Sequence, residues 1–181
     1  MPSVYLSPSV QDFNTTILGE SEEFFMNLIA DAMIPYLEAS GITYGRNDPG
    51  MTLAQVIAQS NAGNYDFHLA LHSNAAPDHL VGVLRGPDVY YYATSTPGRA
   101  AAELFASNLQ KIYPEPSAVG IIPSTTLAEL RRIRVPSNLI EIAYHDNWAD
   151  AVWIAENIEA IAANLVLSLT EYFGIPFVNL Y

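Results

Sequence analysis

The chain has 181 residues, with 7 basic and 19 acidic side chains and a formal charge of −12. This charge excludes the basic face that binding to nucleic acid or to an anionic membrane surface requires. Because the chain has no cysteine, disulfide bonds and thiolate zinc sites are excluded as well. The length predicts a single domain over residues 1–181, with a sizeable core.

Strands and helices alternate in the first half of the chain. We predict a short strand at residues 4–6, a polar loop at residues 10–20, and a helix at residues 22–39 with apolar side chains at helical spacing. A second helix is predicted at residues 51–61. The apolar run at residues 67–71 predicts a buried strand.

The second half continues this alternation. We predict strand pieces at residues 81–93, a helix at residues 98–112, and strands at residues 118–122 and 139–143. One long helix is predicted from a cap at Asn147 to Tyr172. The pattern predicts an α/β fold with three layers, in which helices cover both faces of a twisted, mostly parallel sheet.

Two further features concern membranes and export. The apolar stretch at residues 158–169 is interrupted by one acidic and two polar side chains, so we interpret it as a buried helix and expect no membrane span. The N-terminus has no basic segment followed by a long apolar stretch, so no signal peptide is visible.

His72 stands where the strand at residues 67–71 ends and small polar residues begin. Ligands of α/β proteins bind outside the carboxyl ends of the strands, so His72 is a candidate ligand. The alternative is a histidine that is hydrogen-bonded for structural reasons. For His68, four residues earlier, we expect a buried histidine with its own partners or a partly exposed one.

Three glutamates are candidates for a cleft that they would share with His72 at the carboxyl ends of the strands. Glu141 lies inside an apolar run, where a carboxylate is costly without a partner or a metal ion nearby. A salt bridge would be the alternative explanation, with Arg131, Arg132 or Arg134. Glu22 and Glu23 open the first long helix, where negative charge is favourable, and the alternative is that one of them points into the cleft as a metal ligand.

Four segments, taken in order, carry a resemblance to a known family. Residues 4–11 resemble an opening strand and an Asp-Pro-Gly-His-Gly turn, and Glu22 corresponds to a glutamate ligand on a helix. Residues 71–75 match a Leu-His-x-Asn-Ala motif, and residues 136–141 match a segment with a catalytic glutamate. Together they resemble the zinc-dependent N-acetylmuramoyl-L-alanine amidases, also called amidase type 3, over nearly the whole chain.

The resemblance implies a zinc ion bound by a His, a Glu and a second His. The last two correspond to Glu22 and His72, but Val10 stands at the position of the first His and is followed by Gln11. Zinc prefers imidazole, thiolate or carboxylate ligands, so a glutamine is unusual there. The Ser-Pro-Ser-x-Gln segment resembles a clostridial-type branch of the family, which would make the missing histidine a feature of that branch. We predict Gln11 as the third metal ligand, with His145 as the alternative.

The family's activity is the hydrolysis of peptidoglycan at the amide between N-acetylmuramic acid and L-alanine of the stem peptide. The resemblance implies a zinc-activated water, with Glu141 as general base and acid. Candidate substrate contacts are Asn74, Arg85 and His145, although His145 could instead only hold its loop. The alternative function is a module that binds peptidoglycan or muropeptides and has lost catalysis together with its first zinc ligand. A metal-independent hydrolase would need a nucleophile that the sequence does not display.

Overall fold

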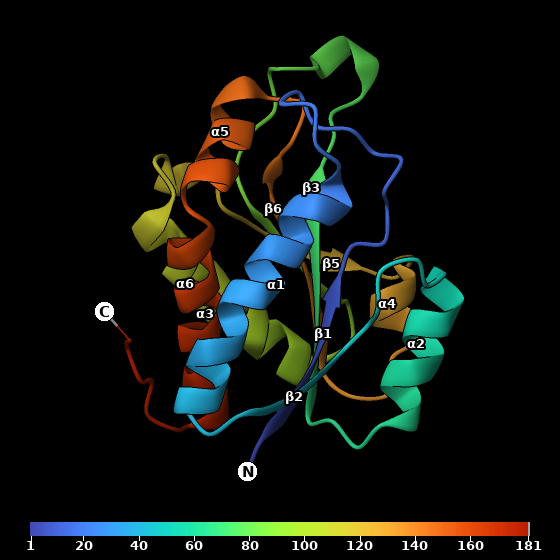
Figure 1. Cartoon of the computed structure of the whole chain (residues 1–181), viewed down its shortest axis with the longest axis vertical. Helices are drawn as coiled ribbons and strands as arrows, with labels where there is room; N and C mark the ends of the chain where they lie inside the picture. Colours follow the sequence, from blue (N-terminus) through green and yellow to red (C-terminus); the bar gives the residue numbers. More distant parts are fainter. Residues whose placement is uncertain (181) are drawn as a thin grey trace.

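The computed structural model describes residues 1–180 and shows one six-stranded sheet flanked by helices (Figure 1). In their order across the sheet, the strands are β2 (Thr43–Arg46), β1 (Ser3–Pro8), β3 (Phe67–Asn74), β6 (Ser137–Tyr144), β4 (Asp88–Tyr92) and β5 (Gly120–Ser124). Only the β4–β6 pair is antiparallel among the strand pairs of these residues. The predicted α/β fold with a mostly parallel sheet is therefore confirmed.

The two faces of the sheet are covered unequally (Figure 1). One face carries the long helices α1 (Glu22–Ala39), α3 (Thr96–Ile112) and α6 (Ile158–Phe173), which pack on one another and on the strands. The other face carries the shorter helices α2 (Leu53–Ala62) and α4 (Ala128–Arg131). The remaining helices are α5 (Trp148–Glu156) and two 3-10 turns at Asp78–Leu80 and Pro116–Ala118.

The side-chain alternation of the central strands sorts polar from apolar residues between these faces. In β3, Leu69 and Leu71 belong to the large apolar core under α1, α3 and α6. His68 and His72 alternate with them and face the side of α2 and α4, where His68 contacts Ser60 of α2. This alternation places polar side chains of the strands in the layer that α2 and α4 cover.

Several element predictions are wrong in detail. The long last helix is two helices, α5 and α6, which meet at an angle of 78°. The strand expected within residues 81–93 is confined to β4. Sequence analysis did not predict β2 or α4, because each is only four residues long and too short for a periodic pattern.

Within residues 1–180, no single helix is long and apolar enough to cross a membrane, and only the bent pair α5 and α6 reaches that length together.

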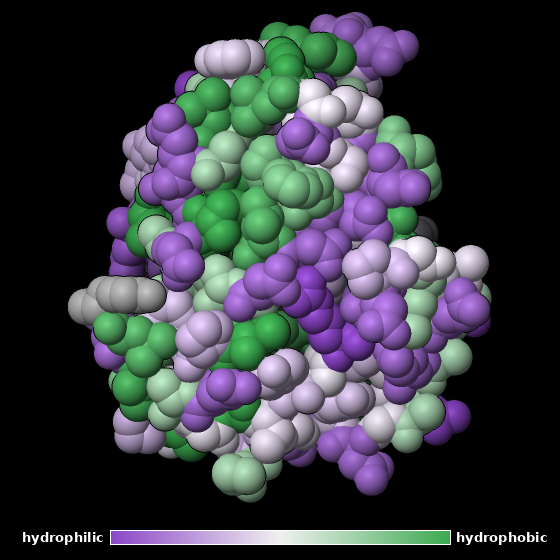
Figure 2. All heavy atoms as spheres, in the orientation of Figure 1, coloured by the Kyte–Doolittle hydropathy of each residue, from purple (hydrophilic) through white to green (hydrophobic). Residues whose placement is uncertain are grey.

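Large apolar side chains are exposed on α1, at Phe24 and Leu28. In the space-filling view of the face that carries α1, hydrophobic residues gather beside a band of hydrophilic ones (Figure 2). Apolar side chains of α1 therefore lie on its outer side as well as on its buried side.

Candidate active site

A cavity of about 580 Å³ lies where the carboxyl ends of β1 and β3 meet α2 and α4. Its wall includes both apolar side chains and groups that can carry out chemistry. The latter come from separate parts of the chain and are Ser7, Ser9, Gln11, His72, Glu129 and Glu141. The carboxyl edge of a parallel sheet is where α/β proteins bind ligands, so the cavity stands at the position that the fold favours.

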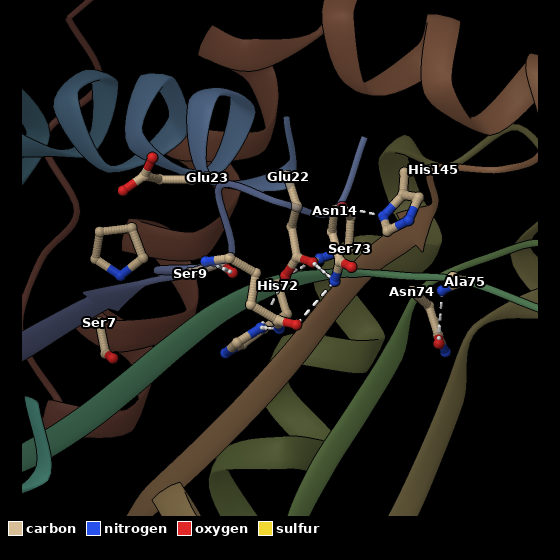
Figure 3. Close-up of polar contacts among 12 residues, drawn as sticks. Ser7, Ser9, Asn14, Glu22, Glu23, His72, Ser73, Asn74, Ala75 and His145 are labelled. Atoms are coloured by element: carbon tan, nitrogen blue, oxygen red, sulfur yellow. Dashed lines mark hydrogen bonds and ion pairs between the residues drawn. The ribbon is translucent and has the colours of Figure 1, made fainter. Parts of the chain in front are cut away.

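Glu22 and His72 lie side by side at this edge (Figure 3). The Oγ of Ser21 caps α1 by accepting from the backbone of Phe24, which begins the helix so that Glu22 is its first residue. A Glu22 carboxylate oxygen lies 2.9 Å from His72 Nδ1, and Glu22 is only 1% exposed. Glu23 points away from this pair (Figure 3). The structure thus places Glu22, and not Glu23, beside His72.

The charge states of the pair follow from their contacts. Burial alone would raise the pKa of Glu22, but the hydrogen bond and charge of His72 lower it below its ordinary value. Burial alone would lower the pKa of His72, but hydrogen bonds to Glu129 and Glu22 raise it to about 10. The metal-free site therefore holds an imidazolium between two carboxylates at neutral pH.

Gln11 is adjacent to His72, as expected for a residue at the site. Its Nε2 lies 3.5 Å from His72 Nδ1, and its Oε1 accepts a hydrogen bond of 2.8 Å from Asn14. The same Asn14 Nδ2 donates to Glu22 Oε2 at 3.1 Å. Asn14 therefore fixes Gln11 and Glu22 relative to each other, a role that the sequence did not reveal.

Glu141 pairs in register with His72 between β6 and β3, so both side chains project from the same face of the sheet. Its Oε2 is buried without a hydrogen-bond partner, and Glu141 forms no salt bridge with an arginine among residues 1–180. Burial raises the pKa of Glu141 to about 7 against the opposing effect of His72, with smaller upward contributions from Glu22 and Asp88. The carboxyl group can therefore gain or lose a proton near neutral pH.

Two acidic residues near the site were not found by sequence analysis. Glu129 of α4 is 4% exposed and contacts His72 Nε2 at 3.2 Å. Asp88 of β4 lies opposite Glu141 in the antiparallel pair, and burial raises its pKa against a hydrogen bond from Tyr144. Glu129 lies in a segment for which no element was predicted, and Asp88 lies in the partly apolar segment 81–93. The acidic side chain itself was the only sequence signal for either residue.

The predicted substrate contacts lie outside the immediate group around His72. His145 is 5% exposed, and its Nδ1 lies 2.9 Å from Ser73 Oγ (Figure 3). Its backbone forms hydrogen bonds with Ile17 and Asn74. Asn74 Oδ1 accepts from the backbone N–H of the next residue. Arg85 pairs with Glu115 at 2.7 Å and lines a different, smaller cavity. The contacts of His145 are those of a residue that holds its loop, and all three substrate roles stay predictions.

The family model of the N-acetylmuramoyl-L-alanine amidases matches residues 10–171. The chain belongs to this family. A search of curated protein sequences finds no match.

Solved structures of amidases share the fold of this family member. One is the N-acetylmuramoyl-L-alanine amidase from Clostridium difficile 630, with 17% identity, a TM-score of 0.83, and coverage of 96% of this chain and 97% of that chain. The catalytic domain of CwlV from Bacillus (Paenibacillus) polymyxa has 16% identity and a TM-score of 0.82, over 97% and 100% of the two chains. AmiC2 of Nostoc punctiforme has 18% identity and a TM-score of 0.80, over 96% and 97%. At these identities the similarity shows the fold alone.

We asked whether the side chains at this site fit the zinc ion that the resemblance implies. Glu22 and His72 supply a carboxylate and an imidazole, both preferred zinc ligands, and they already lie 2.9 Å apart. Within residues 1–180, no group of three or more His, Cys, Asp or Glu side chains is arranged to hold a metal ion. The residues present therefore fit zinc through two side chains of preferred type, and the amide of Gln11 stands beside them.

Proposed function

We propose that the chain hydrolyses peptidoglycan at the amide between the lactyl group of N-acetylmuramic acid and L-alanine of the stem peptide. Membership of the amidase family supports the reaction class, and the fold supports the position of the site. The observation that carries the proposal concerns Glu141, which lies in register with His72 at the cavity and whose buried Oε2 has no hydrogen-bond partner among residues 1–180.

The chain's own residues divide the work as follows. Glu141, with a pKa of about 7, is ionised in a large fraction of molecules at neutral pH and takes a proton from the attacking water. It then donates this proton to the nitrogen of L-alanine as the amide bond breaks. Glu22, His72 and Gln11 would hold zinc. When bound, zinc would polarise the scissile carbonyl and acidify water, which is the chemistry that such sites supply.

The release of stem peptides from purified cell-wall sacculi tests the role of Glu141. We expect Glu141→Gln to lower the rate about 100- to 10,000-fold, because a general base of this kind contributes that much to the rate. Glu103→Gln is the matched control, since Glu103 is 53% exposed on α3, pairs with Arg99 and is not among the residues that line the cavity. Unchanged release by Glu141→Gln, in a folded protein, would exclude this role.

Metal stoichiometry tests the zinc proposal separately. Protein purified without a polyhistidine tag, exposed to zinc and then dialysed, should retain about one zinc ion per chain, as expected for a single site. His72→Ala should lose this zinc. A folded protein that binds muropeptides without zinc and without turnover would contradict the proposal and favour the binding module.

A further inference from the structure

A buried chain of hydrogen bonds continues from the active site into the layer under α2 and α4. One end is the contact between Glu22 and His72 Nδ1, at 2.9 Å. On the other side of the same ring, His72 Nε2 lies 3.2 Å from Glu129 Oε2. Glu129 Oε1 in turn lies 3.2 Å from His68 Nε2. The imidazole of His72 is thus held at both nitrogens by carboxylates from different helices.

The position of Glu129 is itself fixed from several elements. Besides the two histidines, its carboxylate accepts a hydrogen bond from Ser7 Oγ of β1. His68 is fully buried, and its Nδ1 lies 2.9 Å from Ser60 Oγ of α2. The ring of Tyr5 stacks on His68 with 5.4 Å between centroids. The carboxylate of Glu129 thus has partners on β1 and β3, and its partner His68 is itself hydrogen-bonded to α2. It therefore has little freedom to move.

We propose that Glu129 is a positioning residue, which orients His72 so that Nε2 is committed to Glu129 and Nδ1 faces Glu22 and Gln11, the other proposed metal ligands. The inference rests on the proposed function for its consequence in catalysis. Histidine ligands generally donate their second ring N–H to a carboxylate or carbonyl, which fixes the tautomer and the ring orientation. Glu129 has the distance, burial and charge for this task.

An apolar side chain could fill the place of Glu129 without the cost of burying a carboxylate. A buried carboxylate is costly to desolvate, and it persists only where several donors compensate that cost. Here one of the three donors is the proposed metal ligand, which ties the orientation of His72 to α4. Glu129 could stabilise the layer without affecting His72, or it could also orient the imidazole of His72. The two roles can be separated, because only an effect on His72 would change the hydrogen bond and the hydrogen exchange at its ring nitrogens.

The first readout is the side-chain nitrogen spectrum of His72 by NMR, recorded at one pH on metal-free protein. In the wild type we expect a slowly exchanging Nε2–H that is hydrogen-bonded to a carboxylate. In Glu129→Gln we expect this signal to shift and its hydrogen to exchange faster, because a single amide oxygen replaces the carboxylate. Glu129→Asp keeps the charge and should show a smaller change. Glu103→Gln should leave the His72 signals unchanged.

The second readout is zinc affinity, measured by competition with a chelator. Loss of a carboxylate behind a histidine ligand typically lowers metal affinity by about 10- to 100-fold, and we expect Glu129→Gln to do so. Glu129→Asp should recover part of this loss, whereas Glu103→Gln should match the wild type.

The outcomes separate this inference from the proposed function. A wild type without a protected Nε2–H on His72, or a folded Glu129→Gln with unchanged His72 signals and zinc affinity, would overturn the positioning role. If Glu129→Gln does not fold, the spectra of the wild type and of Glu129→Asp decide the question. A wild type that neither binds zinc nor releases stem peptides would contradict the proposed function, while the metal-free spectra still test the orientation of His72.

Discussion

At the scale of single residues, Glu141 combines its proposed chemical role with a cost in stability. Burial raises its pKa from an ordinary value of 4.5 to about 7 in the folded chain. The folded state therefore binds this proton more tightly than the unfolded state does. Well below pH 4.5 the carboxyl is protonated in both states, so its burial has no effect on the pH dependence of stability there. Between pH 4.5 and about 7, stability falls as the pH rises.

Replacing Glu141 should accordingly stabilise the protein at alkaline pH. In EDTA at pH 8, we expect Glu141→Gln to raise the free energy of unfolding by about 1–3 kcal/mol, because each pKa unit corresponds to about 1.4 kcal/mol. At pH 4 the difference should largely vanish. Denaturant unfolding at both pH values measures it, with Glu103→Gln as the exposed control. Equal gains at pH 4 and pH 8 would show that the ionisation of Glu141 is not the cause.

The same group predicts the acid limb of the pH–rate profile. A general base must be ionised, so the rate of stem-peptide release should fall as the pH drops through about 7, the pKa of Glu141. The rate with a soluble muropeptide substrate should be measured from pH 5 to pH 9 at constant ionic strength. A rate that is flat down to pH 5 would argue against Glu141 as the base.

At the scale of elements, the start of α1 sets the place of Glu22. Ser21 caps α1, and Ser95 caps α3 in the same way, by accepting from Gly98, but α1 begins with Glu22 whereas α3 begins with Thr96. We expect Ser21→Ala and Ser95→Ala each to lower stability by about 1 kcal/mol, the usual effect of losing such a cap.

The two cap variants should differ in function. Only Ser21→Ala should weaken zinc retention and slow stem-peptide release, because only its helix begins with Glu22. Thermal unfolding and the two assays, run on both variants, make the comparison. Equal activity of the two variants would show that the cap does not position Glu22.

Elements also show how far sequence reasoning reaches. The positions of His72 and Glu141 toward the carboxyl ends of β3 and β6 were predictable, since each is a polar residue that interrupts an apolar run, and the carboxyl edge of such a sheet is where ligands bind. Glu129 was not, because α4 is one turn long and has no side-chain cap. The break before α6 was hidden as well, because buried apolar residues run through both helices and neither glycine nor proline marks the bend.

At the scale of the molecule, the two faces of the sheet differ in composition and in role. The side of α1, α3 and α6 holds the large apolar core, whereas the side of α2 and α4 holds a small cluster around Ala70, Leu130 and Leu139. The same layer also holds the polar network of His68, Glu129 and Ser60. The apolar side supplies most of the buried hydrophobic surface, so the polar side is free to hold the site.

The difference between the two layers allows a test of the prediction that residues 1–181 form one domain. Tyr181 lies outside the residues that the structure describes. All six strands share one sheet, so the two layers should unfold together. Leu165→Ala in the large core and Leu130→Ala in the small cluster should each cost about 2–5 kcal/mol, the usual effect of emptying a buried leucine site. Both should shift a single transition, with coincident curves by circular dichroism and tryptophan fluorescence. A separate early step in Leu130→Ala alone would mean that the layer holding Glu129 unfolds independently of the core.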